Sequence, residues 1–281
     1  MKNSFKHFLT TTAILLVVAC GSSKELTQAL NNNDPDEGPK ARYELANELY
    51  EKGDYYKAIQ LYEVIINERI LVDDLAEIYF KYANCHFAQF DYETASTLYN
   101  GFYVSYPDDE NAEQAYFTRA ICSYEMADGD FRLDQTNLVK AMDEFADYLI
   151  TYPDGEFAEE AQNRMDEIRF SIEQKELDNG NLYLKIGEYK AAIEEYNRFI
   201  EDFPSSELVE NAYYGMLESR YLLAKNSIEE KQQDRFKRVF SDHEFFIDRY
   251  PESTFLNEAN EINEQALKDY EKLYSNEQAN N

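Results

Sequence analysis

Apolar positions recur along the chain with the period of an α-helix, and the recurrence is anchored on four prolines. Each of these prolines follows an aromatic residue, in Tyr106-Pro107, Tyr152-Pro153, Phe203-Pro204 and Tyr250-Pro251. Upstream of each proline, three matching positions are separated by four and then three residues, which places them on one face of a helix. They are Ala95, Tyr99 and Phe102; Ala141, Phe145 and Tyr148; Ala192, Tyr196 and Phe199; and Val239, His243 and Phe246. The pattern predicts helices that end at the prolines, because the proline ring cannot continue the hydrogen-bond ladder.

A second helix is predicted to open after each proline, because an alanine recurs eight residues later in Glu-rich segments, at Ala115, Ala161, Ala212 and Ala259. Helical hairpins repeated at such spacing are typical of a solenoid, in which each hairpin packs on its neighbours. The sequence therefore predicts an all-α fold, an α-solenoid of about five hairpins with a C-terminal capping helix from about Thr254 to Tyr274. We expect the repeats to begin near Ala41, Asp74, Asn111, Phe157 and Leu208.

Small residues at matching positions resemble those of tetratricopeptide repeats, in which small side chains let the two helices of a hairpin approach closely. They are Ala46, Ala83, Ala120, Gly180 and Gly215 in the first helices, and Ala58, Ala95, Ala141, Ala192 and Val239 in the second. The turns Gly53-Asp54-Tyr55, Phe90-Asp91-Tyr92 and Gly187-Glu188-Tyr189 match the family's Gly-Asp-Tyr turn.

Three repeats are longer than the 34-residue unit of that family. We assign the excess to loops at Asp128–Thr136 and Asn226–Asp234 and to a long helix from Phe157 to Lys185. That helix divides the predicted array into repeats one to three, residues 41–156, and a second half of two repeats and the capping helix, residues 157–275. Residues 276–281 are expected to form a tail.

The N-terminus reads as a secretory signal. Lys2 and Lys6 precede an apolar stretch at 8–19, which is too short to cross a bilayer as a helix. The sequence Val17-Val18-Ala19-Cys20-Gly21 resembles the lipobox of bacterial lipoproteins, which implies cleavage after residue 19 and lipidation of Cys20. An ordinary signal peptide with an incidental cysteine is the alternative. Residues 21–40 are rich in Ser, Asn, Asp and Pro and predict, with Cys20, a flexible tether.

Composition excludes several classes of function. The chain has 27 Lys and Arg against 56 Asp and Glu, a formal charge of −29, so we expect no nucleic-acid partner. The three His and three Cys are too scattered for a local metal cluster, and no motif places a catalytic constellation or a cofactor. We therefore predict no enzymatic activity, no metal site and no cofactor. Cys85 and Cys122 are expected to be buried free thiols, and His86 and His243 to be structural.

The lipobox, the tether, the five repeats with Tyr-Pro or Phe-Pro endings and the long helix together resemble the BamD family, tetratricopeptide lipoproteins of the bacterial β-barrel assembly machinery. The resemblance covers essentially all of the mature chain. It implies an outer-membrane lipoprotein that faces the periplasm, binds the POTRA domains of BamA, and binds unfolded outer-membrane β-barrel proteins to promote their folding and insertion. Another periplasmic repeat adaptor, serving peptidoglycan or a different envelope complex, is the alternative.

Two binding sites follow. First helices line the concave face of a tetratricopeptide solenoid, so we expect a peptide-binding groove formed by Tyr43, Asn47, Tyr50, Phe80, Asn84, Phe87, Phe117, Ile121 and Tyr124. In this hypothesis the asparagines bond the peptide backbone and the rings pack its apolar side chains; alternatively, the rings fill space between helices. The resemblance also implies a BamA contact at the turn after the long helix, which in proteobacterial members of the family is charged and contains Arg. Here that turn contains Ile186, Glu188 and Tyr189, which makes transfer of this contact tentative.

Overall fold

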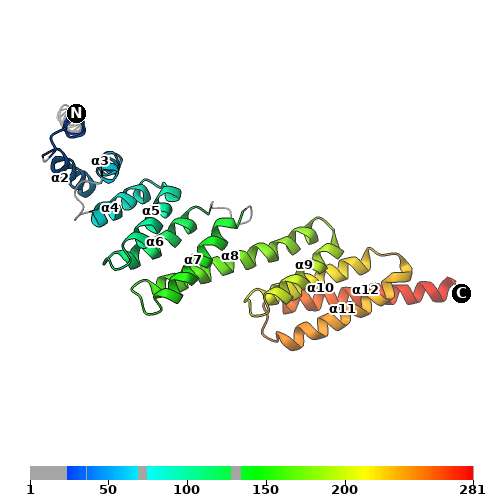
Figure 1. Cartoon of the computed structure of the whole chain (residues 1–281). Helices are drawn as coiled ribbons and strands as arrows, with labels where there is room; N and C mark the ends of the chain where they lie inside the picture. The colour runs from blue at the N-terminus through cyan, green and yellow to red at the C-terminus, as the bar shows by residue number, and fades with distance from the viewer. Residues whose placement is uncertain (1–23, 36, 69–74, 128–133, 281) are drawn as a thin grey trace, which may run out of the picture. The chain divides into compact units, whose positions relative to one another are not determined.

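A computed structural model describes residues 24–35, 37–68, 75–127 and 134–280. In these ranges every regular element is an α-helix, which confirms the predicted fold class (Figure 1). The signal peptide, Cys20 and most of the loop predicted at Asp128–Thr136 lie outside the described residues. The chain divides into two compact units, Met1–Met165 and Asp166–Asn281, called unit 1 and unit 2 below. None of the described helices is long and apolar enough to cross a membrane.

Unit 1 contains three helical hairpins in chain order. They are α2 Glu37–Glu51 with α3 Tyr55–Glu68, α4 Leu75–Ala88 with α5 Tyr92–Ser105, and α6 Ala112–Glu125 with α7 Thr136–Thr151. Each helix packs on the next, within and between hairpins. The long helix α8, Ala158–Lys185, begins in unit 1 and ends in unit 2.

Unit 2 continues with α9 Tyr189–Asp202, α10 Val209–Lys225, α11 Glu229–Arg249 and α12 Leu256–Asn280. Helix α12 packs on both α10 and α11, and its Ala259 and Ala266 are fully buried with Phe246 and Leu217. It therefore covers the apolar surface of the last hairpin, as expected of a capping helix.

The Tyr-Pro and Phe-Pro endings have the same geometry in both units. In each, the backbone N–H of the residue before proline bonds the carbonyl four residues earlier, and the helix stops there. The two rings at these positions contact each other with centroids 5.3–5.5 Å apart, in the pairs Phe102–Tyr106, Tyr148–Tyr152, Phe199–Phe203 and Phe246–Tyr250. Each proline thus ends a helix whose last turn is fixed by an aromatic pair.

The small residues at matching repeat positions lie where helices pack closely, as predicted. All seven alanines and Val239 among them have no exposed surface. The two glycines, Gly180 and Gly215, lie on either side of the fully buried Tyr196 ring, and a Cβ atom at Gly215 would lie 2.4 Å from Tyr196 Cζ. Close packing in unit 2 therefore requires these two glycines.

Three boundaries differ from the prediction. Residues 24–30 are helical, and Leu26 and Ala29 are buried with Ala46 and Leu49, so the tether predicted at 20–40 does not extend over this segment. The guanidinium of Arg42 fixes the segment further by donating to the Asn32 carbonyl at 3.1 Å. Leu26, Ala29 and Leu30 have the spacing of one helix face, which drives this packing.

The other two differences are extensions of helices. Helix α11 begins at Glu229, so most of the loop predicted at Asn226–Asp234 is helical, and acidic residues in its first turn favour that start. Helix α12 continues to Asn280 and so includes residues 276–280 of the predicted tail, because no glycine or proline interrupts it.

Candidate functional site: an aromatic groove in unit 1

Unit 1 contains an open cavity of about 400 Å³ on the side formed by its first helices. Tyr50 of α2, Asn84 and Phe87 of α4, and Phe117 of α6 line it, and all four were predicted in the groove. Ile121, also expected there, lines it as well. The cavity is further lined by Tyr55, Tyr99, Gln114, Thr118, Phe157, Glu160 and Arg164, which sequence reasoning missed.

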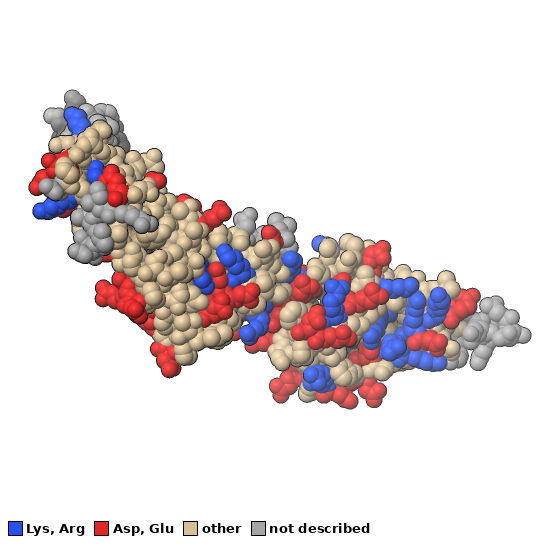
Figure 2. Space-filling model, in the orientation of Figure 1, with Lys and Arg blue, Asp and Glu red and all other residues tan. Residues whose placement is uncertain are grey.

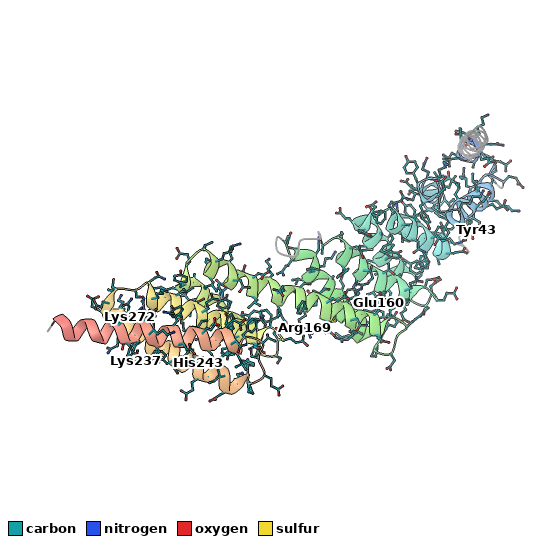
Figure 3. All side chains as sticks on the ribbon, turned by 180° about the vertical axis from the view of Figure 1, so that it is seen from behind. Tyr43, Glu160, Arg169, Lys237, His243 and Lys272 are labelled. Carbon is teal, nitrogen blue, oxygen red and sulfur yellow. The ribbon has the colours of Figure 1, made fainter. Side chains whose placement is uncertain are left out.

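The other four predicted residues do not line this cavity. Phe80 is buried and packs on Phe102 with ring centroids 5.3 Å apart, so it belongs to the core. Tyr43, labelled on α2 in Figure 3, donates a hydrogen bond to Glu77 at 3.2 Å. The Tyr124 ring contacts the guanidinium of Arg164 at 5.0 Å. For these three residues, the alternative of rings that serve packing and contacts within the protein fits better.

The groove asparagines have internal partners, which changes their expected role. Tyr62 donates to Asn47 Oδ1 at 2.8 Å, and Tyr99 donates to Asn84 Oδ1 at 2.7 Å. Asn84 also donates to the hydroxyl of Tyr50 at 3.1 Å. These oxygens satisfy tyrosine hydroxyls inside the hairpins, and so they are not available to bond a peptide backbone.

The same pairing recurs in unit 2, where Tyr196 donates to Asn181 Oδ1 at 2.7 Å. In all three pairs the asparagine precedes its tyrosine by 15 residues. In the third repeat both partners are apolar, Ile121 and Phe145, so the donor and the acceptor disappear together. This joint replacement is a signal in the sequence that could have identified the asparagines as structural.

The walls of the cavity are held by aromatic contacts. The rings of Phe117 and Phe157 stack with centroids 4.7 Å apart, and Tyr50 meets Tyr55 edge to face at 5.8 Å. Phe87 contacts Tyr92 at 5.4 Å, which fixes the ring at the cavity wall while it stays partly exposed. Burial raises the pKa of Tyr50, so its hydroxyl stays neutral over the physiological range.

One charged pair lies at the edge contributed by α8. Arg164 is 3.8 Å from Glu160, which Figure 3 labels on α8. Gln114 and Thr118 of α6 add polar atoms to the same cavity. The groove therefore combines apolar rings with a few polar groups, the arrangement that suits an extended peptide with large apolar side chains.

The turn after α8 exposes part of the second predicted site. The Ile186 side chain is 60% exposed, and Leu182, one helical turn earlier, is 55% exposed. Glu188 is exposed and precedes α9, whereas Tyr189 is half-buried. Gly187 has φ of +85°, and its N–H bonds the Leu184 carbonyl, so the turn is fixed by the backbone. Leu182 was missed, although its spacing from Ile186 predicts a shared face.

The cysteines and histidines considered as candidate sites are buried or bonded within the protein. Cys85 and Cys122 are buried free thiols, as predicted, and burial raises the pKa of each to about 12. His86 Nδ1 lies 2.9 Å from Asp91 Oδ2, and His243 Nε2 lies 2.8 Å from Asn260 Oδ1. Within the described ranges, no three His, Cys, Asp or Glu residues are grouped to hold a metal ion.

Comparison with known proteins adds relatives with described roles. Outer membrane protein assembly factor BamD of Caulobacter vibrioides is 26% identical over 145 residues, which cover 52% of this chain and 47% of that protein. BamD of Rickettsia prowazekii is 27% identical over 132 residues, 47% of this chain and 52% of that protein. The chain thus matches about half the length of these curated relatives.

A solved structure and a family profile complete the comparison. The TPR2AB domain of yeast Sti1, solved in its pHSP90 complex, aligns with a TM-score of 0.42 at 13% identity, covering 84% of this chain and 86% of that one. The profile of the YfiO family, described as outer membrane lipoprotein, matches residues 35–235 and 183–270. The profile match spans most of the described repeats. The chain belongs to the YfiO family of outer membrane lipoproteins.

Proposed function

We propose that the chain is a subunit of the outer-membrane β-barrel assembly machinery, anchored by lipid at Cys20 and facing the periplasm. The family match across residues 35–270 carries this proposal, and two relatives named as assembly factors support it over an adaptor of another envelope complex. The proposed activity is binding without chemical catalysis. Its parts are a client groove in unit 1 and a partner surface in unit 2.

The groove suits unfolded barrel proteins because their strands alternate apolar and polar side chains. Phe87 and Tyr50, which are both partly exposed, offer ring surfaces to apolar side chains of an extended client. Because the groove asparagines already bond tyrosines, we assign backbone recognition to the side chain of Gln114, which also lines the cavity. Client recognition then depends mainly on ring packing, which tolerates many sequences that share an aromatic and apolar character.

The exposed turn after α8 suits a folded partner. Leu182 and Ile186 form an exposed apolar pair on one helix face, and Glu188 adds a charge beside them. Apolar side chains this exposed, bordered by polar groups, are typical of a protein interface. We propose that this surface docks BamA through its POTRA domains.

Depletion of the protein in its own cells tests the proposed function. We expect the amounts of β-barrel proteins in the outer membrane to fall and their unfolded forms to accumulate. Re-expression of the parent chain should restore both. Unchanged barrel levels after depletion would contradict the proposal.

A matched pair of variants tests the groove in the same cells. Phe87→Ala removes a groove ring, whereas Phe90→Gly removes a ring from the same hairpin that is 77% exposed and does not line the cavity. We expect F87A to weaken client binding about tenfold, a loss of about 1.4 kcal/mol, and F90G to bind as the parent does. Equal binding by the three proteins would remove the groove from the mechanism.

A further inference from the structure

Unit 2 contains a second cavity, of about 420 Å³, whose lining differs from that of the groove. Three arginines reach it: Arg220 from α10, and Arg235 and Arg238 from α11. Ile193 and Leu223 supply its apolar lining, and Asp234 adds a carboxylate. All of these residues lie within unit 2, so the cavity is formed by the packing of α9, α10 and α11.

The local charge is opposite to that of the whole protein. Between Arg220 and Arg238 the sequence has six Lys and Arg against three Asp and Glu, in a chain with a formal charge of −29. Figure 2 shows Lys and Arg side chains gathered on the drawn face of unit 2, and Figure 3 labels Lys237 on α11. A basic cavity in so acidic a protein creates a local attraction for anions.

The protein's own carboxylates neutralise this charge only in part. Asp242 pairs with Arg220, and Asp234 lies 3.8 Å from Lys237. Arg235 donates to Ser227 Oγ, a neutral group. Arg238 is exposed and makes no ion pair within 4 Å among the residues that the structure describes. Arg220, Arg235, Lys237 and Arg238 thus face two carboxylates, which leaves a net positive site.

We propose that this cavity is a docking site for an acidic segment of a partner polypeptide, with a carboxylate held by Arg235 and Arg238. Guanidinium groups bind carboxylates through two parallel hydrogen bonds, and their charge assists both. Ile193 and Leu223 accommodate the aliphatic stem of the acidic residue or an apolar neighbour. Ile228, 62% exposed, lies in the short connection between α10 and α11 and follows Ser227, the residue that accepts from Arg235.

A polypeptide fits this site better than a polyanionic surface does. Anionic membranes and nucleic acids present many charges at once, and the −29 charge of the protein repels them within a Debye length of about 10 Å at 0.1 M salt. A single acidic side chain that enters the cavity meets mainly the arginines. The inference goes beyond the proposed function and does not rest on it, because neither the client groove nor the α8 turn is part of this cavity.

Fluorescence anisotropy with the full chain in detergent tests the site. The probe is a labelled peptide, Gly-Glu-Leu-Glu-Glu-Leu-Gly, compared with the same peptide carrying Gln in place of Glu. We expect the acidic peptide to bind, the Gln peptide to bind at least tenfold more weakly, and binding to weaken as salt rises from 0.05 to 0.5 M. No binding of the acidic peptide, or equal binding of both peptides, would overturn the proposal.

A charge-matched pair of double variants locates the binding. Arg235→Gln with Arg238→Gln removes the two arginines, and Lys175→Gln with Lys190→Gln removes two charges elsewhere in unit 2. We expect the arginine variant to lose at least tenfold in affinity for the acidic peptide and the lysine variant to stay within twofold of the parent. An equal loss in both variants would overturn the proposal, because it would show that only the net charge matters.

Other occupants are distinguished by two further arms of the experiment. Inorganic phosphate and phosphatidylglycerol vesicles are tested against the same variants, and arginine-dependent binding as tight as that of the acidic peptide would show a general anion site instead. Sedimentation of the chain alone measures self-association. Self-association that disappears only in the arginine variant would identify a second copy as the occupant and overturn the proposal. A monomer with unchanged sedimentation supports it.

Discussion

The two units are built on the same internal packing but present different cavities. In both, a buried tyrosine donates to an asparagine 15 residues earlier, as Tyr99 does in unit 1 and Tyr196 in unit 2. The cavity of unit 1 is lined by rings, whereas that of unit 2 is lined by arginines. The repeat therefore determines the packing, and the remaining first-helix and second-helix positions determine what each unit can bind.

The largest expected effect concerns the shared tyrosine. Tyr196→Ala and Tyr99→Ala should each lower the free energy of unfolding of their own unit by about 3–5 kcal/mol, because each removes a large buried ring from a close-packed site. Native-state hydrogen exchange, which reports each unit separately, is the measurement. A loss of stability that is large in one unit and below about 1 kcal/mol in the other would show that the two units do not share the same packing.

The tyrosine–asparagine bond is tested next by copying the third repeat into unit 2. Asn181→Ile alone should cost about 1–3 kcal/mol, because it leaves the Tyr196 hydroxyl buried without its acceptor. The double variant N181I with Y196F reproduces the Ile121 and Phe145 pair and should recover most of that loss. A double-mutant cycle from urea unfolding measures the coupling. Additive costs would show that the two residues do not act as a pair.

The turns give a smaller effect. Phe90 has φ of +61°, at the position where the equivalent turns have Gly53 and Gly187 with φ of +74° and +85°. A side chain in this left-handed region costs about 1 kcal/mol, so Phe90→Gly should stabilise unit 1 by up to about that amount. Gly53→Ala should destabilise it. Thermal unfolding of the two variants measures both signs, and destabilisation by F90G would contradict this account of the turn.

The smallest effects are pH-dependent and opposite in sign. Desolvation by burial raises the pKa of Glu218 in unit 2, so the folded unit holds that proton more tightly, and stability falls as pH rises above the ordinary carboxyl value. A hydrogen bond from Lys81 lowers the pKa of Glu77 in unit 1, so its contribution is present above the ordinary value and lost on acidification. We expect E218Q to be more stable than the parent at pH 7 and E77Q to be less stable.

Both differences should shrink as the pH falls through the carboxyl range, and the E77Q difference should persist to lower pH because the pKa of Glu77 is lowered. Urea midpoints measured at neutral and acid pH test this. Differences of the same sign for the two variants at pH 7 would contradict the assigned causes of the pKa shifts.

Sequence reasoning predicted what depends on local period and backbone. The proline endings, the small packing positions and the long helix follow from spacings within a single repeat. The N-terminal helix at 24–30 was missed because its polar composition outweighed the one-face spacing of Leu26, Ala29 and Leu30. In the same way, the length excess in repeat five was assigned to a loop, although Glu229 begins a helix there.

The candidate sites were harder to predict because their residues come from different helices. Asn47 and Asn84 lie on the expected face, but their partners lie 15 residues later on the next helix, which changed their role from binding to packing. Phe157 and Arg164 reach the groove from α8, outside the first three hairpins. The three arginines of unit 2 were not predicted because the total charge of the chain is strongly negative. Only the local excess of Lys and Arg between residues 220 and 238 indicates them.

Site-specific photocrosslinking in cells most directly tests the proposal that unit 1 binds clients and unit 2 binds BamA. A photoreactive residue at position 87, in the groove, is compared with one at position 186, in the exposed turn after α8. The account predicts that the first captures unfolded β-barrel proteins and the second captures BamA. Capture of the same partner at both positions, or of barrel proteins only at position 186, would contradict it.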